Sequence, residues 1–143
     1  MADFGEELDG AEPVRHVACG VHGHVRQEPA NEDAPIAPED WYQQTKYEGE
    51  KVAASYASRG LRVVTLRPTA IYGPGDPGRF LNLFRMVGRG YFLMFGPGTV
   101  HYHPVYIDNL LDAFERAAES ERGDGEAYLI GDEKYHSLNA LVK

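Results

Sequence analysis

A short β-branched run directly after a long polar segment constrains the fold of this chain more than any other feature. Leu61–Leu66 is rich in valine and is bounded by Gly60 and Pro68, which predicts a strand. The preceding segment, 41–58, is dominated by Glu, Gln, Lys and Ala, which predicts a helix with Asp40 as its N-cap. A helix that leads into such a strand is typical of α/β proteins.

The rest of the chain continues this alternation. Segments with strand or helix periodicity follow one another at 14–19, 79–87, 91–106, 107–120, 127–130 and 138–142. Their order, strand, helix, strand, helix, strand, predicts an α/β fold with a parallel sheet. Residues 1–13 are acidic and aperiodic, so we expect a loose tail followed by one domain over 14–143.

Composition excludes several classes of protein. The formal net charge is −8, whereas binders of nucleic-acid phosphates need clustered positive charge. No apolar run approaches the ~18 residues of a membrane helix, and the first residues lack the pattern of a secretory signal. Cys19 is the only cysteine, so no internal disulfide and no Cys-based zinc site can form. We therefore expect a cytoplasmic protein with a small-molecule substrate and no nucleic-acid or membrane partner.

The most informative segment for chemistry is Tyr42-Gln-Gln-Thr-Lys46, inside the expected helix. Tyr42 and Lys46 are four residues apart, so their side chains share one helix face. An ammonium favours the phenolate, and lowering a tyrosine pKa from about 10 to about 7 takes roughly 4 kcal/mol. A desolvated pocket with a cationic cofactor supplies that energy, whereas an exposed helix face does not. The spacing alone leaves an acid/base pair and a solvated surface pair both open.

A second pair, Tyr47 and Lys51, has the same spacing. Five helical residues rotate the direction of the side chain by about 140°, so the two pairs cannot serve one site. Only the surrounding sequence distinguishes them.

Several blocks around the first pair occur in a recognisable order. They are Gly20-Val-His22-Gly23, Asn31–Pro35, the Tyr42–Lys46 segment followed by Gly49-Glu50, Leu66-Arg-Pro-Thr-Ala-Ile-Tyr-Gly-Pro-Gly-Asp76, His103–Leu110 and Glu126–Gly131. In these blocks the chain resembles the extended short-chain dehydrogenases/reductases, the NAD-dependent epimerase/dehydratase group, from about Val14 to Lys143. The resemblance implies part of a doubly wound, Rossmann-like parallel sheet with a small C-terminal substrate lobe.

The resemblance also implies roles on the cofactor side of a site. Tyr42 would be the general acid/base, and Lys46 would hold the nicotinamide ribose and lower the tyrosine pKa. The backbone around Pro68 and Ile71 would meet the nicotinamide amide. The implied cofactor is NAD or NADP, and the residue that selects between them is not in the matching blocks.

On the substrate side, the resemblance implies that Tyr72 and the rest of the 72–76 loop border the substrate. His101 stands near the point where nucleotide-sugar members carry an arginine that contacts the substrate phosphates. A neutral histidine weakens that reading without removing it. The expected substrate is therefore a secondary alcohol or ketone of the nucleotide-sugar or hydroxysteroid type.

Two departures from the family pattern argue against activity of this chain alone. Four residues before His22 the family has a Ser or Thr that bonds the reacting oxygen, but Ala18 has no hydroxyl. The family also begins with a glycine-rich turn that holds the cofactor pyrophosphate, and only thirteen residues precede the first matching strand here. We expect a chain without the N-terminal dinucleotide-binding half, with weak or absent cofactor binding and no activity alone.

Three readings of such a chain stay open. It is part of an enzyme of this group, a non-catalytic remnant or interaction module, or a truncated reading of a longer enzyme. A homodimer through the 41–58 helix is the expected form of association.

Two further patterns suggest sites that the chemistry does not support. Gly73-Pro-Gly75-Asp-Pro-Gly78 fits the spacing GxGxxG, but its prolines remove amide donors and Asp76 places negative charge where a phosphate would lie. We therefore expect a loop there. The pairs His22/His24 and His101/His103 have strand spacing, but no further ligand of known spacing completes a first shell, so no metal site is predicted.

Overall fold

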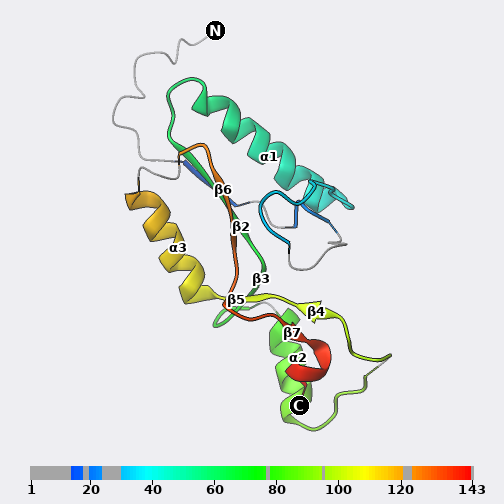
Figure 1. Cartoon of the computed structure of the whole chain (residues 1–143). Helices are drawn as coiled ribbons and strands as arrows, with labels where there is room; N and C mark the ends of the chain where they lie inside the picture. Colours follow the sequence, from blue (N-terminus) through cyan, green and yellow to red (C-terminus); the bar gives the residue numbers. More distant parts are fainter. Residues whose placement is uncertain are drawn as a thin grey trace. The chain divides into compact units, whose positions relative to one another are not determined.

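The computed structural model describes residues 14–17, 20–23, 30–76, 78–94, 96–120 and 124–142. Its elements, in chain order, are β1 (Val14–Val17), α1 (Trp41–Ala57), β2 (Val63–Pro68), β3 (Ala70–Tyr72), α2 (Arg79–Gly88), β4 (His101–Tyr102), β5 (Pro104–Tyr106), α3 (Ile107–Glu119), β6 (Ala127–Ile130), β7 (His136–Ser137) and α4 (Leu138–Leu141) (Figure 1). They form two compact units. The first contains β1, α1, β2, β6 and α3 from Asp112 onward, and the second contains the remaining elements with the start of α3.

A parallel sheet in the order β1-β2-β6 forms the centre of the first unit, which confirms the expected α/β class. The register runs from Val14↔Val63 to Val17↔Leu66 and from Thr65↔Ala127 to Pro68↔Ile130. The central strand, β2, is buried along its whole length. Figure 1 shows why: α1 lies on one side of the sheet, and the part of α3 from Asp112 lies on the other. Burial on both faces is typical of parallel strands.

The long helix α1 begins and ends close to where the sequence predicts. The Asp40 carboxylate accepts a hydrogen bond from the Gln43 amide at 2.7 Å, which confirms the N-cap. At the other end, the Tyr56 carbonyl accepts from the Leu61 amide at 3.2 Å, and Gly60 has a φ of +91°. Because Leu61 closes the helix end, β2 begins at Val63 rather than at Leu61 and extends to Pro68.

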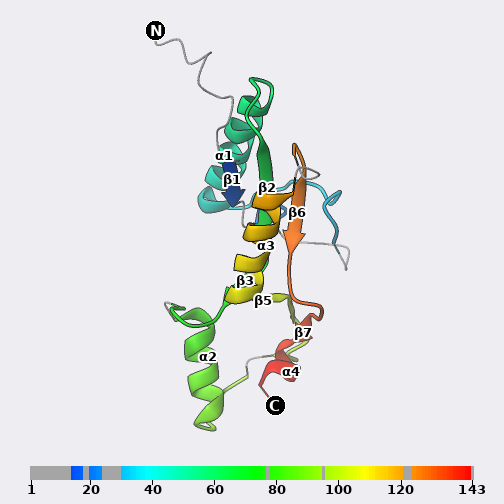
Figure 2. The same cartoon turned by 90° about the vertical axis from the view of Figure 1, so that its left-hand side faces the viewer.

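The orientation of α1 places its N-terminal end at a functionally important edge. α1 runs antiparallel to β2 (Figure 1), and the view turned by 90° shows the same arrangement (Figure 2). Its first turn, with Trp41 and Tyr42, therefore lies toward the carboxyl ends of the parallel strands. Ligands of open α/β sheets bind at this edge.

The acidic loop before α1 contacts β6, at the edge of the sheet. The Glu32 carboxylate accepts a hydrogen bond from the Leu129 amide of β6 at 2.9 Å. β6 is an edge strand among the described residues, and an unpaired edge amide invites another chain. Glu32 thus satisfies an edge donor that the sheet leaves open, a role that the sequence did not suggest.

The second unit contains two short two-stranded sheets. β3 pairs with β5 in parallel, and β4 pairs with β7 antiparallel. Among the described residues of 91–106, strand structure is confined to β4 and β5, so the expected β segment near residue 91 is wrong. There, Tyr91 donates its amide to the Met86 carbonyl at 3.0 Å, which extends the end of α2 instead.

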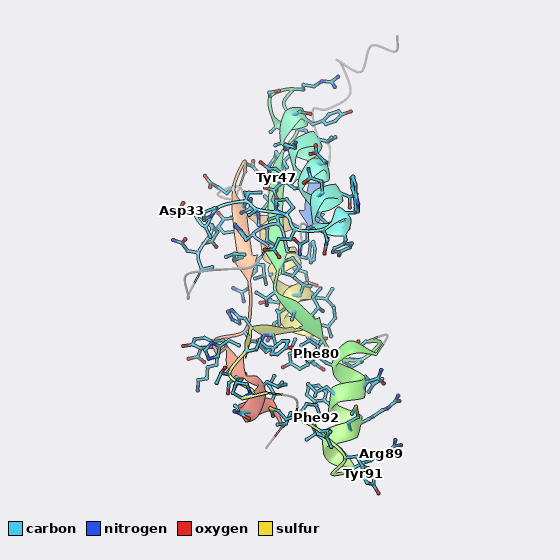
Figure 3. The ribbon with its side chains drawn as sticks, turned by 90° about the vertical axis from the view of Figure 1, so that its right-hand side faces the viewer. Asp33, Tyr47, Phe80, Arg89, Tyr91 and Phe92 are labelled. Carbon is cyan, nitrogen blue, oxygen red and sulfur yellow. The ribbon has the colours of Figure 1, made fainter. Side chains whose placement is uncertain are left out.

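An aromatic cluster forms the core of this unit. The Tyr72 ring lies 6.0 Å from the Phe80 ring, 6.4 Å from the Phe84 ring and 5.3 Å from the Tyr106 ring, between centroids. Phe80, labelled on α2 in Figure 3, is only 4% exposed. Edge-on contacts of this kind favour a defined packing, so the cluster fixes α2 against β3 and β5.

The Gly73–Gly78 loop, whose glycine spacing fits the dinucleotide-binding motif, contains the carboxylate of Asp76. The Asp76 carboxylate accepts hydrogen bonds from the amides of Gly78 at 2.9 Å, Phe80 at 2.9 Å and Leu81 at 2.8 Å. These are amides of the α2 N-terminus, the groups that would bind a phosphate. The Asp76 carboxylate therefore takes the position that a bound phosphate would have. This agrees with the prediction that the segment is a loop and not a phosphate site.

Replacing Asp76 by alanine should lower the free energy of unfolding by about 1–2 kcal/mol, because α2 loses its cap. Urea unfolding measures this change. The control is Asp112→Ala, which removes an exposed pair with Arg116 at 2.7 Å and should cost only a few tenths of a kcal/mol. Equal losses in the two variants would contradict the capping role.

Candidate active site

Both Tyr-x-x-x-Lys pairs lie on α1 with an ammonium beside a ring. The Lys46 Nζ is 5.4 Å from the Tyr42 ring centroid, and the Lys51 Nζ is 5.0 Å from the Tyr47 ring centroid. Each distance is within the range of a cation–π contact. The expectation that residues four apart share a face is thus confirmed for both pairs.

The surroundings distinguish the two pairs. Lys51 forms an ion pair with Glu48 at 2.7 Å on the exposed side of the helix, where its hydrogen bond holds the pKa of Glu48 below the usual range. Lys46 is half-buried, and the tyrosines have the reverse pattern, since Tyr42 is exposed and Tyr47 is half-buried. Tyr42 is 57% exposed in the first turn of α1. Figure 3 labels Tyr47, which lies farther along the helix.

The hydroxyl that would complete the family's site is not supplied by α1. Thr45 Oγ1 donates to the Tyr42 carbonyl at 2.7 Å, so its proton is used inside the helix. Ala18, which the resemblance predicts at the Ser/Thr position of the family, lies outside the described residues.

The six predicted ligand-contacting residues fall into the two units. Tyr42, Lys46 and Pro68 belong to the first, and the other three, Ile71, Tyr72 and His101, belong to the second. Pro68 is the last residue of β2 and is buried. The first unit therefore brings the Tyr-Lys helix and the end of β2 to the same edge of one sheet.

In the second unit, the Tyr72 hydroxyl faces a carboxylate. It donates to Asp132 Oδ2 at 3.3 Å, and burial together with the charge of Asp132 raises the pKa of Tyr72. Asp132 also accepts from the Tyr106 amide at 3.2 Å and from Asn109 Nδ2 at 2.7 Å. Tyr72 is thus held as a neutral hydroxyl. Its contact with substrate stays a prediction.

The two other predicted residues of this unit have simple surroundings. Ile71 is 38% exposed and is paired with Val105. His101 is exposed on β4, where its ring lies 5.1 Å from the Tyr135 ring. Within the described ranges, no group of three or more His, Cys, Asp or Glu side chains could hold a metal ion.

A buried polar network beside the Tyr-Lys pair was not foreseen. Arg67 of β2 bonds both carboxylate oxygens of Glu50 on α1, with its Nε 3.2 Å and its Nη2 2.5 Å away. Its Nη1 lies 3.3 Å from His22 Nε2. An arginine between Leu66 and Pro68 in an otherwise apolar strand was the available signal, because a buried charge requires a partner.

Comparisons with known proteins agree with the geometry. The model of the NAD dependent epimerase/dehydratase family matches residues 13–131. The chain is 36% identical over 109 residues to the UDP-glucose 4-epimerase of Vibrio cholerae, covering 75% of this chain and 33% of that protein. It is 34% identical over 124 residues to the 3beta-hydroxysteroid-dehydrogenase/decarboxylase isoform 1 of Arabidopsis thaliana, covering 78% and 27%.

A solved structure gives the same picture. The UDP-glucose 4-epimerase of Thermotoga maritima, determined with UDP-glucose, superposes with a TM-score of 0.78 at 28% identity, covering 93% of this chain and 46% of that one. The chain therefore spans about a third of the length of the curated relatives, and less than half of this structure. No helix in the described part of the chain is both long and apolar enough to cross a membrane.

Proposed function

Because the chain belongs to the NAD dependent epimerase/dehydratase family, we propose that it is the acid/base part of an NAD(P)-dependent enzyme acting on a secondary alcohol or ketone. The observation that carries this proposal is the Lys46 ammonium, 5.4 Å from the Tyr42 ring at the carboxyl edge of a parallel sheet. Lys51, the lysine of the second pair, has a side chain that is 50% exposed, whereas Lys46 is half-buried.

The chemistry of the pair fits the cofactor end that the family uses. Lys46 and Tyr42 are hydrogen-bond donors suited to ribose hydroxyls. NAD(P), when bound, exchanges a hydride with the substrate carbon. Tyr42 as phenolate takes the proton of the substrate alcohol and returns it to a ketone oxygen, while the Lys46 charge stabilises the phenolate.

Weak cofactor binding by the isolated chain is part of the proposal. A pyrophosphate needs a set of free backbone amides, usually at a helix N-terminus. At the N-terminus of α2, the amides of Gly78, Phe80 and Leu81 already donate to Asp76. The segments that match the family thus contain groups suited to the nicotinamide end of a cofactor site, and fewer groups suited to its phosphate end.

For the substrate, we favour a nucleotide sugar and keep a hydroxysteroid as the second candidate. The 36% identity to the Vibrio cholerae epimerase supports the first, and the 34% identity to the Arabidopsis dehydrogenase/decarboxylase supports the second.

A homodimer through α1 is also proposed, because Trp41 is 87%, Val52 58% and Tyr56 41% exposed on that helix. The single cysteine suits a cytoplasmic location.

The test joins the N-terminal half of the Vibrio cholerae epimerase to residues 14–143 of this chain. We expect the fusion to interconvert UDP-glucose and its 4-epimer with NAD, as measured by NMR of the sugar protons. The hydroxysteroid alternative predicts oxidation of a 3β-hydroxysteroid instead. A folded fusion that binds NAD but converts neither substrate would contradict the proposal.

Cofactor binding by the chain itself can be read from Trp41, the only tryptophan, which precedes Tyr42. Energy transfer from Trp41 to bound NADH or NADPH reports occupancy. We expect a Kd in the millimolar range or weaker. Micromolar binding would contradict the weak phosphate end and would require another amide cradle.

A further inference from the structure

We propose that Glu50, Arg67 and His22 form a clamp that sets the rotation of α1 about its axis and thereby orients Lys46 and Tyr42. The catalytic meaning of this clamp rests on the proposed function. The existence of the clamp does not. All three residues lie in the first unit, on α1, on β2 and in the loop after β1.

The clamp is needed because apolar packing does not fix α1. No residue of α1 is buried, whereas α2 has Phe80 and α3 has Leu110 at 4% exposure each. The half-buried positions of α1 include Gln43, Lys46 and Glu50 beside Tyr47, Ala53 and Ala57, so none of them carries a branched aliphatic side chain. A helix held by such a face has a poorly defined rotation unless polar contacts define it.

The Glu50–Arg67 contact supplies that definition. The side chains are only 13% and 8% exposed, and the guanidinium engages both carboxylate oxygens. A bidentate fork has one favourable orientation, so it restricts the direction of Glu50 more than a single contact does. Buried pairs of this kind contribute more to structural specificity than to stability in some proteins.

His22 fixes the other side of the guanidinium. Arginine can only donate, so His22 Nε2 at 3.3 Å accepts and the ring proton resides on Nδ1. Nδ1 donates to the Ala34 carbonyl at 2.9 Å, in the loop that leads into α1. His22 is 8% exposed, and the network joins the loop after β1, strand β2, the loop before α1 and α1 itself.

Helical geometry transmits this orientation to the proposed acid/base pair. Lys46 is one turn before Glu50 and about 40° away around the axis, and Tyr42 is two turns before it, about 80° away and roughly 12 Å along the axis. A rotation of α1 that turns this face away from the sheet would carry the Lys46 ammonium toward solvent. Glu50, Arg67 and His22 are thus positioning residues, since they act through α1.

The experiment compares the reactivity of Lys46 and Lys51 in the full chain. Brief acylation under native conditions, read by peptide mass spectrometry, gives the Lys46 to Lys51 labelling ratio. We expect Glu50→Gln to raise this ratio several-fold, because Lys46 turns toward solvent while Lys51 is already exposed. Arg67→Lys should do the same, since a lysine lacks the fork that spans Glu50 and His22.

The matched control is Asp124→Asn, which removes an ion pair with Arg62 at 2.8 Å in the same unit but away from the clamp. Each variant is labelled at a temperature that lies the same number of degrees below its own Tm. In this control, the labelling ratio of Lys46 to Lys51 should stay at the wild-type value. An unchanged ratio in Glu50→Gln, or an equal rise in Asp124→Asn, would overturn the clamp.

Two additions keep the outcome decisive. If Glu50→Gln does not fold, His22→Gln and His22→Leu replace it. Glutamine offers both an acceptor and a donor and should preserve the labelling ratio, whereas leucine should raise the ratio.

In the fusion enzyme, Glu50→Gln should lower kcat with little change in KM. A changed ratio with unchanged kcat would overturn the positioning role, whereas an inactive wild-type fusion would refute the proposed function alone.

Discussion

Replacing Tyr42 by phenylalanine in the fusion enzyme should lower kcat by roughly 10²–10⁴-fold, because phenylalanine has no proton to exchange. The aromatic ring beside Lys46, 5.4 Å from its ammonium, is retained, so the Tm should change little. Steady-state kinetics with UDP-glucose measures the loss, and the melting curve confirms that the fold is intact.

The chain provides a matched control for this variant. Tyr47→Phe alters the second pair, whose ammonium lies 5.0 Å from its ring, and should leave kcat close to that of the parent fusion. If Tyr47→Phe abolished turnover and Tyr42→Phe did not, the proposed site would move to the second pair. If both variants kept full activity, neither tyrosine would be the acid/base.

Replacing Gly23 by alanine should destabilise the chain by about 2–5 kcal/mol. Gly23 has a φ of +60°, a conformation that costs an L residue roughly 1–2 kcal/mol. A Cβ there would also overlap the Ala37 carbonyl oxygen, and forced overlap costs a further ~1–3 kcal/mol. The Ala37 amide donates to the Val21 carbonyl at 3.0 Å, so this part of the loop cannot move without losing a hydrogen bond.

Gly20→Ala is the control in the same loop. Gly20 has a φ of +72°, and the nearest atom to an added Cβ would be the flexible Gln43 Cγ at 3.4 Å. This variant should cost only the backbone term, about 1–2 kcal/mol. Urea unfolding followed by far-UV circular dichroism measures both variants. Equal losses would show that the Ala37 contact does not restrain the loop.

The Gly23 variant also bears on the site. Gly23 follows His22, and Ala37 lies between Ala34, which His22 bonds at 2.9 Å, and the start of α1. A displaced loop would therefore disturb the clamp from the side opposite Glu50. The labelling ratio of Lys46 to Lys51 should rise in Gly23→Ala and stay unchanged in Gly20→Ala.

Elements with strong local signals were predictable from the sequence. α1 and β6 lie where their patterns place them, and the Asp40 cap is as expected, because each depends on neighbouring residues alone. The parallel sheet followed from the alternation of these elements. The reading of the Gly73–Gly78 loop also depended on local chemistry, since Asp76 bonds amides only two to five residues away.

The short strands β3 and β7 could not be predicted. They have three and two residues, too few for a periodic pattern, and they exist because β5 and β4 lie beside them. The bounds of the two compact units, of which the sequence anticipated only a small C-terminal lobe, were likewise not contained in any local pattern. Both features depend on which segments meet in space.

By itself, then, the sequence determined an α/β order and a helix with Tyr42 and Lys46 on one face, because helical spacing is a local property. It also indicated the family. Only the tertiary structure decided that Glu50 of α1 meets a buried guanidinium of the sheet. Arg67 meets Glu50 across 17 residues and His22 across 45, and no local pattern encodes such distant partners. A buried guanidinium must find its partners from whatever the fold brings near, so this contact appears only once α1 and β2 are packed together.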